Sequence, residues 1–118
     1  MKIIRLYEMT RADTQDPLNH EMAIRQILAG RPIVACGVAE FAPGLCAHEG
    51  EKHVHEYDEL FIILAGEITV PITGGPTERA RAGDCAFVAA GEEHHLTNHT
   101  SLPAVALYIL VGPPKESP

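Results

Sequence analysis

The sequence predicts an all-β protein made of a single domain, residues 1–118. Glycines and prolines that favour turns recur at intervals of about 8 to 12 residues, a spacing typical of a β-sandwich or β-barrel. The segments between the turns are short and rich in β-branched residues, so they fit strands better than helices. A chain of 118 residues can bury one hydrophobic core but is too short for two domains.

The expected strands follow one another along the chain. The first is an edge strand from Lys2 to Glu8, followed by a polar loop. The later strands are apolar segments bounded by turns: Ile33 to Ala42, Glu59 to Ala65, Glu67 to Thr73, Asp84 to Ala89 and Ala104 to Val111. The tail from Gly112 is expected to be frayed, as chain ends commonly are.

The segment from His20 to Ala29 fits two structures. Its apolar residues are spaced as in one face of a helix, but Gly30 and Pro32 end the pattern quickly. Because the segments that follow it are all expected to be strands, we favour a strand here too.

The run from Leu60 to Ala65 is apolar throughout and shows no alternation with polar residues. A strand of this kind is buried on both faces. In a small barrel one face fills the interior, and the other must then meet a second sheet or a second subunit. We therefore expect a homodimer.

The composition excludes several classes of protein. The chain has 9 basic and 16 acidic residues, a net charge of -7, and no basic cluster, so nucleic-acid binding is not expected. No apolar run approaches the roughly 18 residues of a membrane span, and residues 1–17 do not resemble a signal peptide. The three cysteines, Cys36, Cys46 and Cys85, lack Cys-x-x-Cys spacing and fit reduced thiols. We expect a cytoplasmic protein with no membrane partner.

Histidine is concentrated in two short windows. Of the 7 histidines, six lie at positions 48, 53, 55, 94, 95 and 99. In the first window, His53 and His55 are two residues apart, so on a strand they project to the same face, about 7 Å apart. Glu59 has the same parity and precedes five apolar residues, where a carboxylate is costly to bury unless it is paired or bound to a metal.

The second window supplies one further candidate ligand. A turn at Gly91 places His94 at the start of a later strand. If that strand lies across the barrel from the first window, His94 joins His53, His55 and Glu59 around a first-row divalent metal. Four protein ligands leave coordination positions open, and open positions are typical of reactive sites rather than structural ones.

The two windows resemble the two sequence motifs of the cupin superfamily. The first window matches as His53-x-His55-x3-Glu59-x6-Gly66, and the second as Gly83-x5-Ala89-x-Gly91-x2-His94-x3-Asn98. The chain departs from the family pattern at Ala89, where the motif has proline, and at Ala47, where it has glycine. The motifs lie within residues 47–98, and the joint match is highly specific.

The resemblance implies a double-stranded β-helix, a small jelly-roll barrel. It also implies one divalent transition metal (Fe, Mn, Ni or Zn) held by His53, His55, Glu59 and His94. Such a site suits a metal-dependent enzyme acting on a small organic molecule, with a cupin dioxygenase as the first choice. An isomerase, decarboxylase or lyase, and a non-catalytic binding or sensing module, stay open as alternatives. The sequence identifies no separate catalytic acid or base.

The remaining residues near the windows have weaker assignments. His48 could line the mouth of the barrel, whereas His95, which has the opposite parity to His94, and His99 are not expected to be ligands. Candidates for binding a substrate, each of which also fits plain core packing, are Phe41, Tyr57, Phe61, Phe87 and Tyr108. The acids of the two windows are expected to be solvated: Glu49, Glu51, Glu56, Asp58, Glu92 and Glu93.

Overall fold

The computed structural model describes residues 1–5, 11–12, 21–22, 25–45, 56–92 and 95–113. Its strands are β1 (Lys2–Arg5), β2 (Arg11–Ala12), β3 (Glu21–Met22), β4 (Ile33–Phe41), β5 (Asp58–Ala65), β6 (Glu67–Val70), β7 (Glu78–Arg81), β8 (Asp84–Val88) and β9 (Ala104–Val111). One short helix, α1, spans Arg25–Leu28. The described part of the chain contains no helix that is long and apolar enough to cross a membrane.

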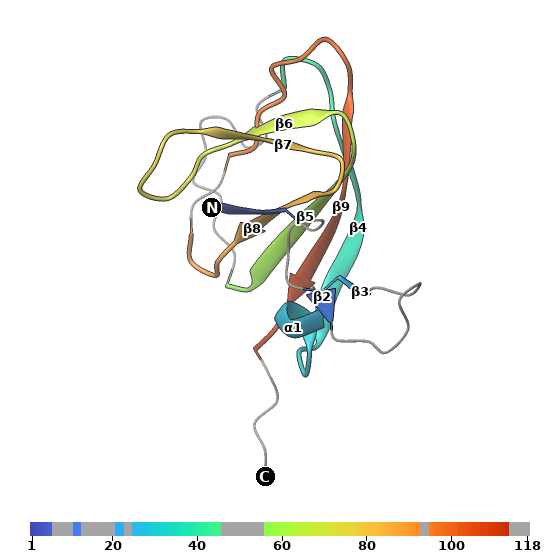
Figure 1. The fold of residues 1–118 in the computed structure, drawn as a ribbon, viewed down its shortest axis with the longest axis vertical. Helices are drawn as coiled ribbons and strands as arrows, with labels where there is room; N and C mark the ends of the chain where they lie inside the picture. The colour runs from blue at the N-terminus through green and yellow to red at the C-terminus, as the bar shows by residue number, and fades with distance from the viewer. Residues whose placement is uncertain (6–10, 13–20, 23–24, 46–55, 93–94, 114–118) are drawn as a thin grey trace.

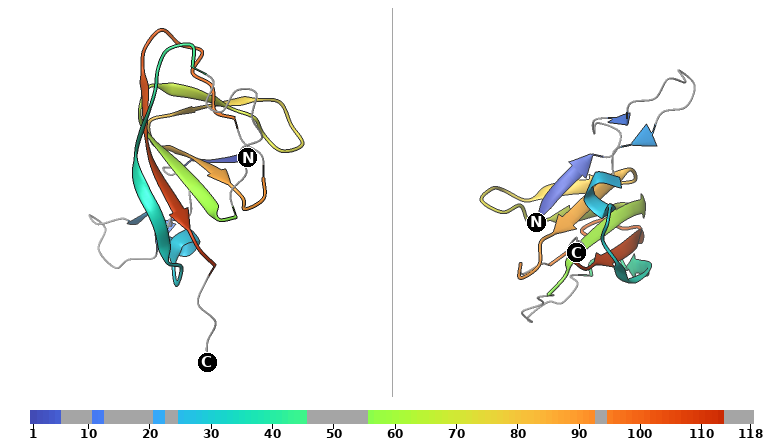
Figure 2. Two further views of the ribbon diagram at one scale, coloured as in Figure 1. Left: turned by 180° about the vertical axis from the view of Figure 1, so that it is seen from behind. Right: turned by 90° about the horizontal axis from the view of Figure 1, so that it is seen from below.

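A five-stranded antiparallel sheet in the order β1-β8-β5-β9-β4 forms the main layer (Figure 1). The β6–β7 hairpin lies across this sheet, as the view from behind shows (Figure 2). This hairpin forms a second layer. Thr69 in β6 also forms an isolated antiparallel bridge with Thr97, so Thr97 lies next to the hairpin. The remaining pair, β2 and β3, forms a small sheet of its own.

Strand β5 lies at the centre of the sheet. It is buried on both faces as far as Ile63, as its apolar run predicts, but Leu64 is 52% exposed and Ala65 is exposed as well. Phe61 and Ile63 point to the inner face, where they pack against the hairpin residues Ile68 and Val70. We call the opposite side, which carries Leu60, the outer face. There Leu60 packs with Cys85, Val111 and two residues of α1, Ile27 and Leu28.

Three local predictions differ from the structure. The strand expected from Glu67 to Thr73 ends at Val70, because Pro71 follows and has no backbone N–H to donate. Arg25–Leu28 is helical, so the strand expected for His20 to Ala29 is wrong over that part. The helix forms because Ile27 and Leu28 can cover the outer face of the sheet, a tertiary contact that local sequence does not reveal. Strand β7 was not predicted, because its sequence Glu-Arg-Ala-Arg is polar and buries only Ala80.

Candidate metal centre

Glu59 is the one candidate ligand that lies within the described residues. The alternation of β5 turns its side chain to the inner face, where it pairs in register with Val88 of β8 and Leu110 of β9. Only 4% of the residue is exposed to solvent. Burial raises the pKa of the Glu59 carboxyl group to about 7. A nearby cation stabilises the charged form of a buried carboxyl group. The burial of Glu59 therefore agrees with a role as a metal ligand.

The histidines predicted to complete the site, His53, His55 and His94, lie outside the described residues. His48 lies outside them as well. Among the side chains that the structure does describe, no three His, Cys, Asp or Glu residues are gathered so as to hold a metal ion. One buried carboxylate and three imidazoles are donors that suit a divalent transition metal. Glu59 and the three predicted histidines therefore fit such a metal.

Asp58, the neighbour of Glu59, joins the segments that carry the two motifs. Its Oδ1 accepts a hydrogen bond from the backbone N–H of Ala90 at 2.7 Å, and its Oδ2 accepts one from Arg31 at 2.7 Å. Arg31 also donates to the carbonyl oxygen of Gly112. The sequence predicts a solvated acid here, whereas the structure makes Asp58 a fixed link between β5 and the turn before His94.

The electrostatics of Asp58 agree with this linking role. Partial burial would raise the pKa of its carboxyl group, but the Ala90 N–H and the Arg31 guanidinium together hold it below the usual value. Asp58 is therefore ionised at neutral pH. Its charge is balanced by Arg31, whose side chain is only 15% exposed.

Glu92 holds the other side of the same turn. It accepts a hydrogen bond from the hydroxyl group of Thr73 at 3.0 Å and forms an ion pair with the amino group of Met1 at 2.6 Å. Burial raises the pKa of the Glu92 carboxyl group, but these two partners outweigh burial and leave it lowered. Like Asp58, Glu92 differs from the solvated acid that the sequence predicts.

Asn98, the last residue of the second motif, fixes the base of the loop that follows. It is fully buried, and its Nδ2 donates to the carbonyl oxygens of Phe41 and Leu102 at 2.9 and 2.8 Å. Its Oδ1 accepts hydrogen bonds from the backbone N–H and the hydroxyl group of Thr100. One side chain thus bonds polar groups of two segments, the end of β4 and the loop that holds Thr100 and Leu102, which explains an asparagine at this position.

Gly66, the last residue of the first motif, allows a close approach of two chain segments. It has a φ of 77°, and a Cβ atom at this position would lie 2.7 Å from the carbonyl oxygen of Pro103. Only glycine fits this backbone conformation and this contact without a shift of the chain.

Three of the five aromatic candidates come together on the inner face. Phe41 and Phe61 are buried and meet edge to face, with ring centroids 6.5 Å apart. Tyr108, which pairs in register with Phe61, packs against the same cluster. Because Phe61 is two residues after Glu59 on β5, these rings form an apolar wall on the same face as the candidate ligand.

The other two aromatic candidates lie elsewhere. Phe87 packs on the outer face with Leu60, so the structure does not bring it together with Glu59. Tyr57 lines a surface hollow of about 370 Å³ with Arg31 and Pro113. His95 is half-buried and His99 is exposed.

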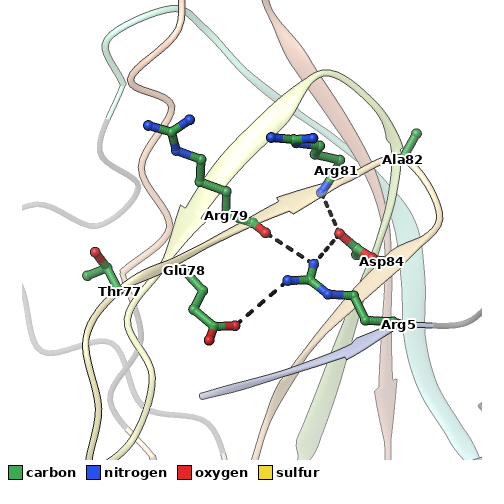
Figure 3. Close-up of a pocket in the computed structure, with 7 residues that line it drawn as sticks. All are labelled: Arg5, Thr77, Glu78, Arg79, Arg81, Ala82 and Asp84. Atoms are coloured by element: carbon green, nitrogen blue, oxygen red, sulfur yellow. Dashed lines mark hydrogen bonds and ion pairs between the residues drawn. The ribbon is translucent and has the colours of Figure 1, made fainter. Parts of the chain in front are cut away.

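A polar hollow of about 530 Å³ lies beside β1 and β7 (Figure 3). Its arginines are paired with acids: Arg5 contacts the buried Asp84 and the carboxylate of Glu78, and Arg81 contacts Glu67 at 3.0 Å. Asp84 also accepts the backbone N–H of Arg81. This network closes the turn between β7 and β8, and its charges are satisfied within the protein.

The fold and the two motifs can now be compared with known proteins. A family model described as a cupin domain matches residues 37–110. The chain belongs to the cupin family. Solved structures share its fold, among them a conserved protein with a double-stranded β-helix domain from Klebsiella pneumoniae. That protein has 22% identity and a TM-score of 0.55, over 68% of this chain and 73% of its own. The fold and family expected from the two motifs are thereby confirmed.

Two solved structures have higher sequence identity to this cupin. The DMSP lyase DddQ from Ruegeria pomeroyi is 32% identical over 66% of this chain, with a TM-score of 0.56. The cupin spans only 38% of the length of that lyase. A second structure, of the protein TT1209 from Thermus thermophilus, is 30% identical over 62% of this chain and 67% of its own, with a TM-score of 0.52. Among proteins of curated function, none matches the sequence.

Proposed function

We propose that this cupin is a metal-dependent enzyme that acts on a small organic molecule. Its metal would be a single divalent transition metal (Fe, Mn, Ni or Zn) bound by His53, His55, Glu59 and His94. The observation that carries the proposal is Glu59: a carboxyl group only 4% exposed, on the inner face, in the position of the family's glutamate. Burying a carboxyl group in an apolar strand costs folding free energy, and a chemical role for Glu59 accounts for that cost.

The chain's own residues would prepare the site in two ways. The wall formed by Phe41, Phe61 and Tyr108 would exclude water from one side and accept an apolar part of the substrate. The links from Asp58 to Ala90 and Arg31 would hold the two motif segments at a fixed distance. When bound, the metal would act as a Lewis acid on an oxygen of the substrate.

The reaction class is proposed from similarity rather than geometry. The 32% identity to a DMSP lyase favours a lyase, one of the alternatives that the sequence left open. The dioxygenase stays as the second candidate, because three imidazoles and one carboxylate also suit iron. An isomerase or decarboxylase would use the same Lewis-acid chemistry. A non-catalytic module would bind its ligand against the same aromatic wall without a reaction.

The experiment that separates these functions measures substrate loss and oxygen uptake on protein loaded separately with iron, manganese, nickel and zinc. Loss of DMSP or a related small acid without oxygen uptake supports the lyase. Oxygen uptake with diketones, flavonols or catechols supports the dioxygenase. Glu59→Gln should abolish either activity, while Glu56→Gln, an exposed acid three residues away, should retain it. Metal-independent turnover, unaffected by Glu59→Gln, would contradict the proposal.

We also propose a cytoplasmic location. The two cysteines within the described residues, Cys36 and Cys85, are free thiols. Cys85 is fully buried, and burial raises the pKa of its thiol to about 12, so it stays protonated and unreactive. Free thiols of this kind are typical of proteins in a reducing compartment.

A further inference from the structure

The chain on both sides of the first-motif histidines is bonded to the second motif. We call residues 46–55, which carry His53 and His55, the histidine segment. The segment itself lies outside the described residues, but both of its flanks are described. Leu45 comes directly before it, and Asp58 comes three residues after its end. Hydrogen bonds at these two flanks reach opposite sides of the second motif.

The flank at Leu45 is bonded to Asn98, the last residue of the second motif. The carbonyl oxygen of Leu45 accepts the backbone N–H of Asn98 at 2.8 Å, and the carbonyl oxygen of Asn98 accepts the N–H of Gly44 at 2.8 Å. The buried side chain of Asn98 adds a bond of 2.9 Å to the carbonyl oxygen of Phe41, where β4 ends. Asn98 therefore fixes the chain just before the histidine segment.

The flank at Asp58 is bonded to the other side of the second motif. Its Oδ1 accepts the backbone N–H of Ala90 at 2.7 Å. Arg31 orients the carboxylate through a bond of 2.7 Å to Oδ2, and Arg31 is itself anchored by a bond of 2.8 Å to the carbonyl oxygen of Gly112. Because Glu59 follows Asp58 in β5, these bonds also fix Ala90 relative to the buried candidate ligand.

The two sets of bonds are placed evenly about His94. Ala90 precedes His94 by four positions, and Asn98 follows it by four. Each flank of the histidine segment is thus bonded to one flank of His94. Chain segments that are joined on both sides cannot separate or slide at those points, so part of the entropy of ordering them is lost on folding rather than on binding.

We propose that Asp58 and Asn98 are positioning residues, which arrange the two histidine-bearing segments for metal binding in the metal-free protein. Metal binding then keeps more of its free energy, because less of it is spent on ordering the ligands. Both carboxylate oxygens of Asp58 already bond to protein groups, so its action on the metal is indirect. This inference rests on the proposed metal site, but it concerns residues outside the four-ligand set.

Metal affinity tests the proposal. The probe is Co²⁺, a spectroscopic substitute for zinc, titrated in competition with a chelator. Asp58→Ala and Asn98→Ala should each weaken Co²⁺ binding by about 10-fold or more, as the loss of outer partners of a metal site commonly does. The matched control is Glu67→Ala, which removes a carboxylate paired with Arg79 and Arg81 in the β6–β7 hairpin. The control should bind Co²⁺ as the wild type does.

Asp58→Asn separates positioning from stability. This variant keeps an oxygen that can accept the Ala90 N–H, but it loses the charge that pairs with Arg31. The unfolding free energy should fall in both Asp58→Asn and Asp58→Ala, whereas Asp58→Asn should recover most of the Co²⁺ affinity. The absorption spectrum of bound Co²⁺, which reports its coordination geometry, should change in Asp58→Ala only. An equal loss of affinity in the two variants would overturn the role of the Ala90 bond.

Amide hydrogen exchange in metal-free protein tests whether the arrangement precedes the metal. The N–H groups of Ala90 and Asn98 should be protected in the wild type before any metal is added. In Asp58→Ala, the Ala90 N–H should exchange quickly while circular dichroism still shows a folded protein. Protection that appears only after Co²⁺ is added would mean that the metal orders these segments, and the proposal would then be wrong.

Failure of this inference can be told apart from failure of the proposed function. A wild-type protein that binds no metal would contradict both. A wild type that binds Co²⁺, with the same affinity as Asp58→Ala and Asn98→Ala, would contradict only the positioning role. If Asn98→Ala does not fold, Asp58→Ala decides the matter, because the Asp58 side chain is 23% exposed and its loss is more easily tolerated.

Discussion

At the scale of single residues, Glu59 is where the fold and the proposed chemistry meet. The pattern of the sequence predicted an inward-facing carboxylate at the start of an apolar strand, and the structure confirms its burial. Its partners in metal binding could not be placed in the same way, because His53, His55 and His94 lie outside the described residues. The ligand set therefore stays a prediction from spacing and family.

The pKa of Glu59 predicts how stability changes with pH in metal-free protein. Its carboxyl group has a pKa of about 7 in the folded state and the ordinary value of 4.5 when unfolded. The folded state thus holds a proton that the unfolded state has lost, so this contribution to stability is complete below pH 4.5 and is lost as pH rises to 7 and above. Urea unfolding at pH 5 and pH 8, with a chelator present, should show this loss.

The control for this effect is Glu59→Gln, which cannot ionise. The variant should lose less stability than the wild type between pH 5 and pH 8. Parallel pH curves for the two proteins would show that Glu59 does not carry the effect.

Gly66 provides a second prediction at this scale. Gly66→Ala places a Cβ atom 2.7 Å from a backbone oxygen, whereas Gly44→Ala has the same φ of 77° but no heavy atom within 4 Å. Gly44→Ala should cost about 1 kcal/mol of unfolding free energy for its backbone conformation alone. Gly66→Ala should cost at least about twice as much, as measured by denaturant unfolding. Equal losses would mean that the close approach at Gly66 has no energetic weight.

At the scale of elements, strands with apolar alternation or an apolar run could be predicted from the sequence. The bounds Ala104–Val111 agree with the prediction, and β5 begins one residue early, at Asp58. Strand β7 and helix α1 could not be predicted, because their conformations depend on tertiary partners. Val70 and Glu78 fix β7 by pairing it to β6, and the outer face of the sheet gives α1 a surface to cover.

The Asn98 network makes a testable claim about how segments are joined. Asn98→Ala removes a donor from the carbonyl oxygens of Phe41 and Leu102. The Leu102 oxygen keeps the hydroxyl group of Thr100 as a donor, whereas the bond to Phe41 is buried and its loss is costly. The expected loss is about 2–4 kcal/mol of unfolding free energy. His99→Ala, an exposed neighbour, should change stability by less than about 0.5 kcal/mol. If chemical denaturation shows the same small loss for both variants, the network is not a stabilising link.

At the scale of the whole molecule, the sequence is sufficient to predict the family and the fold, whereas the structure is needed to find contacts between distant segments. The two motifs were sufficient to predict the family and the fold, because their joint spacing is specific. Asp58 was misjudged, because nothing in its local sequence reveals the contacts with Arg31 and Ala90, which lie 27 and 32 residues away. The expected homodimer stays a prediction.

The central claim is that His53, His55, Glu59 and His94 bind one metal ion. The most direct test is elemental analysis of purified wild-type protein and of three variants, Glu59→Ala, His94→Ala and the exposed control His99→Ala, with circular dichroism to confirm folding. We predict about one divalent transition metal per chain in the wild type and in His99→Ala, and a sharp loss in Glu59→Ala and His94→Ala. Full metal occupancy in folded Glu59→Ala or His94→Ala would contradict the claim.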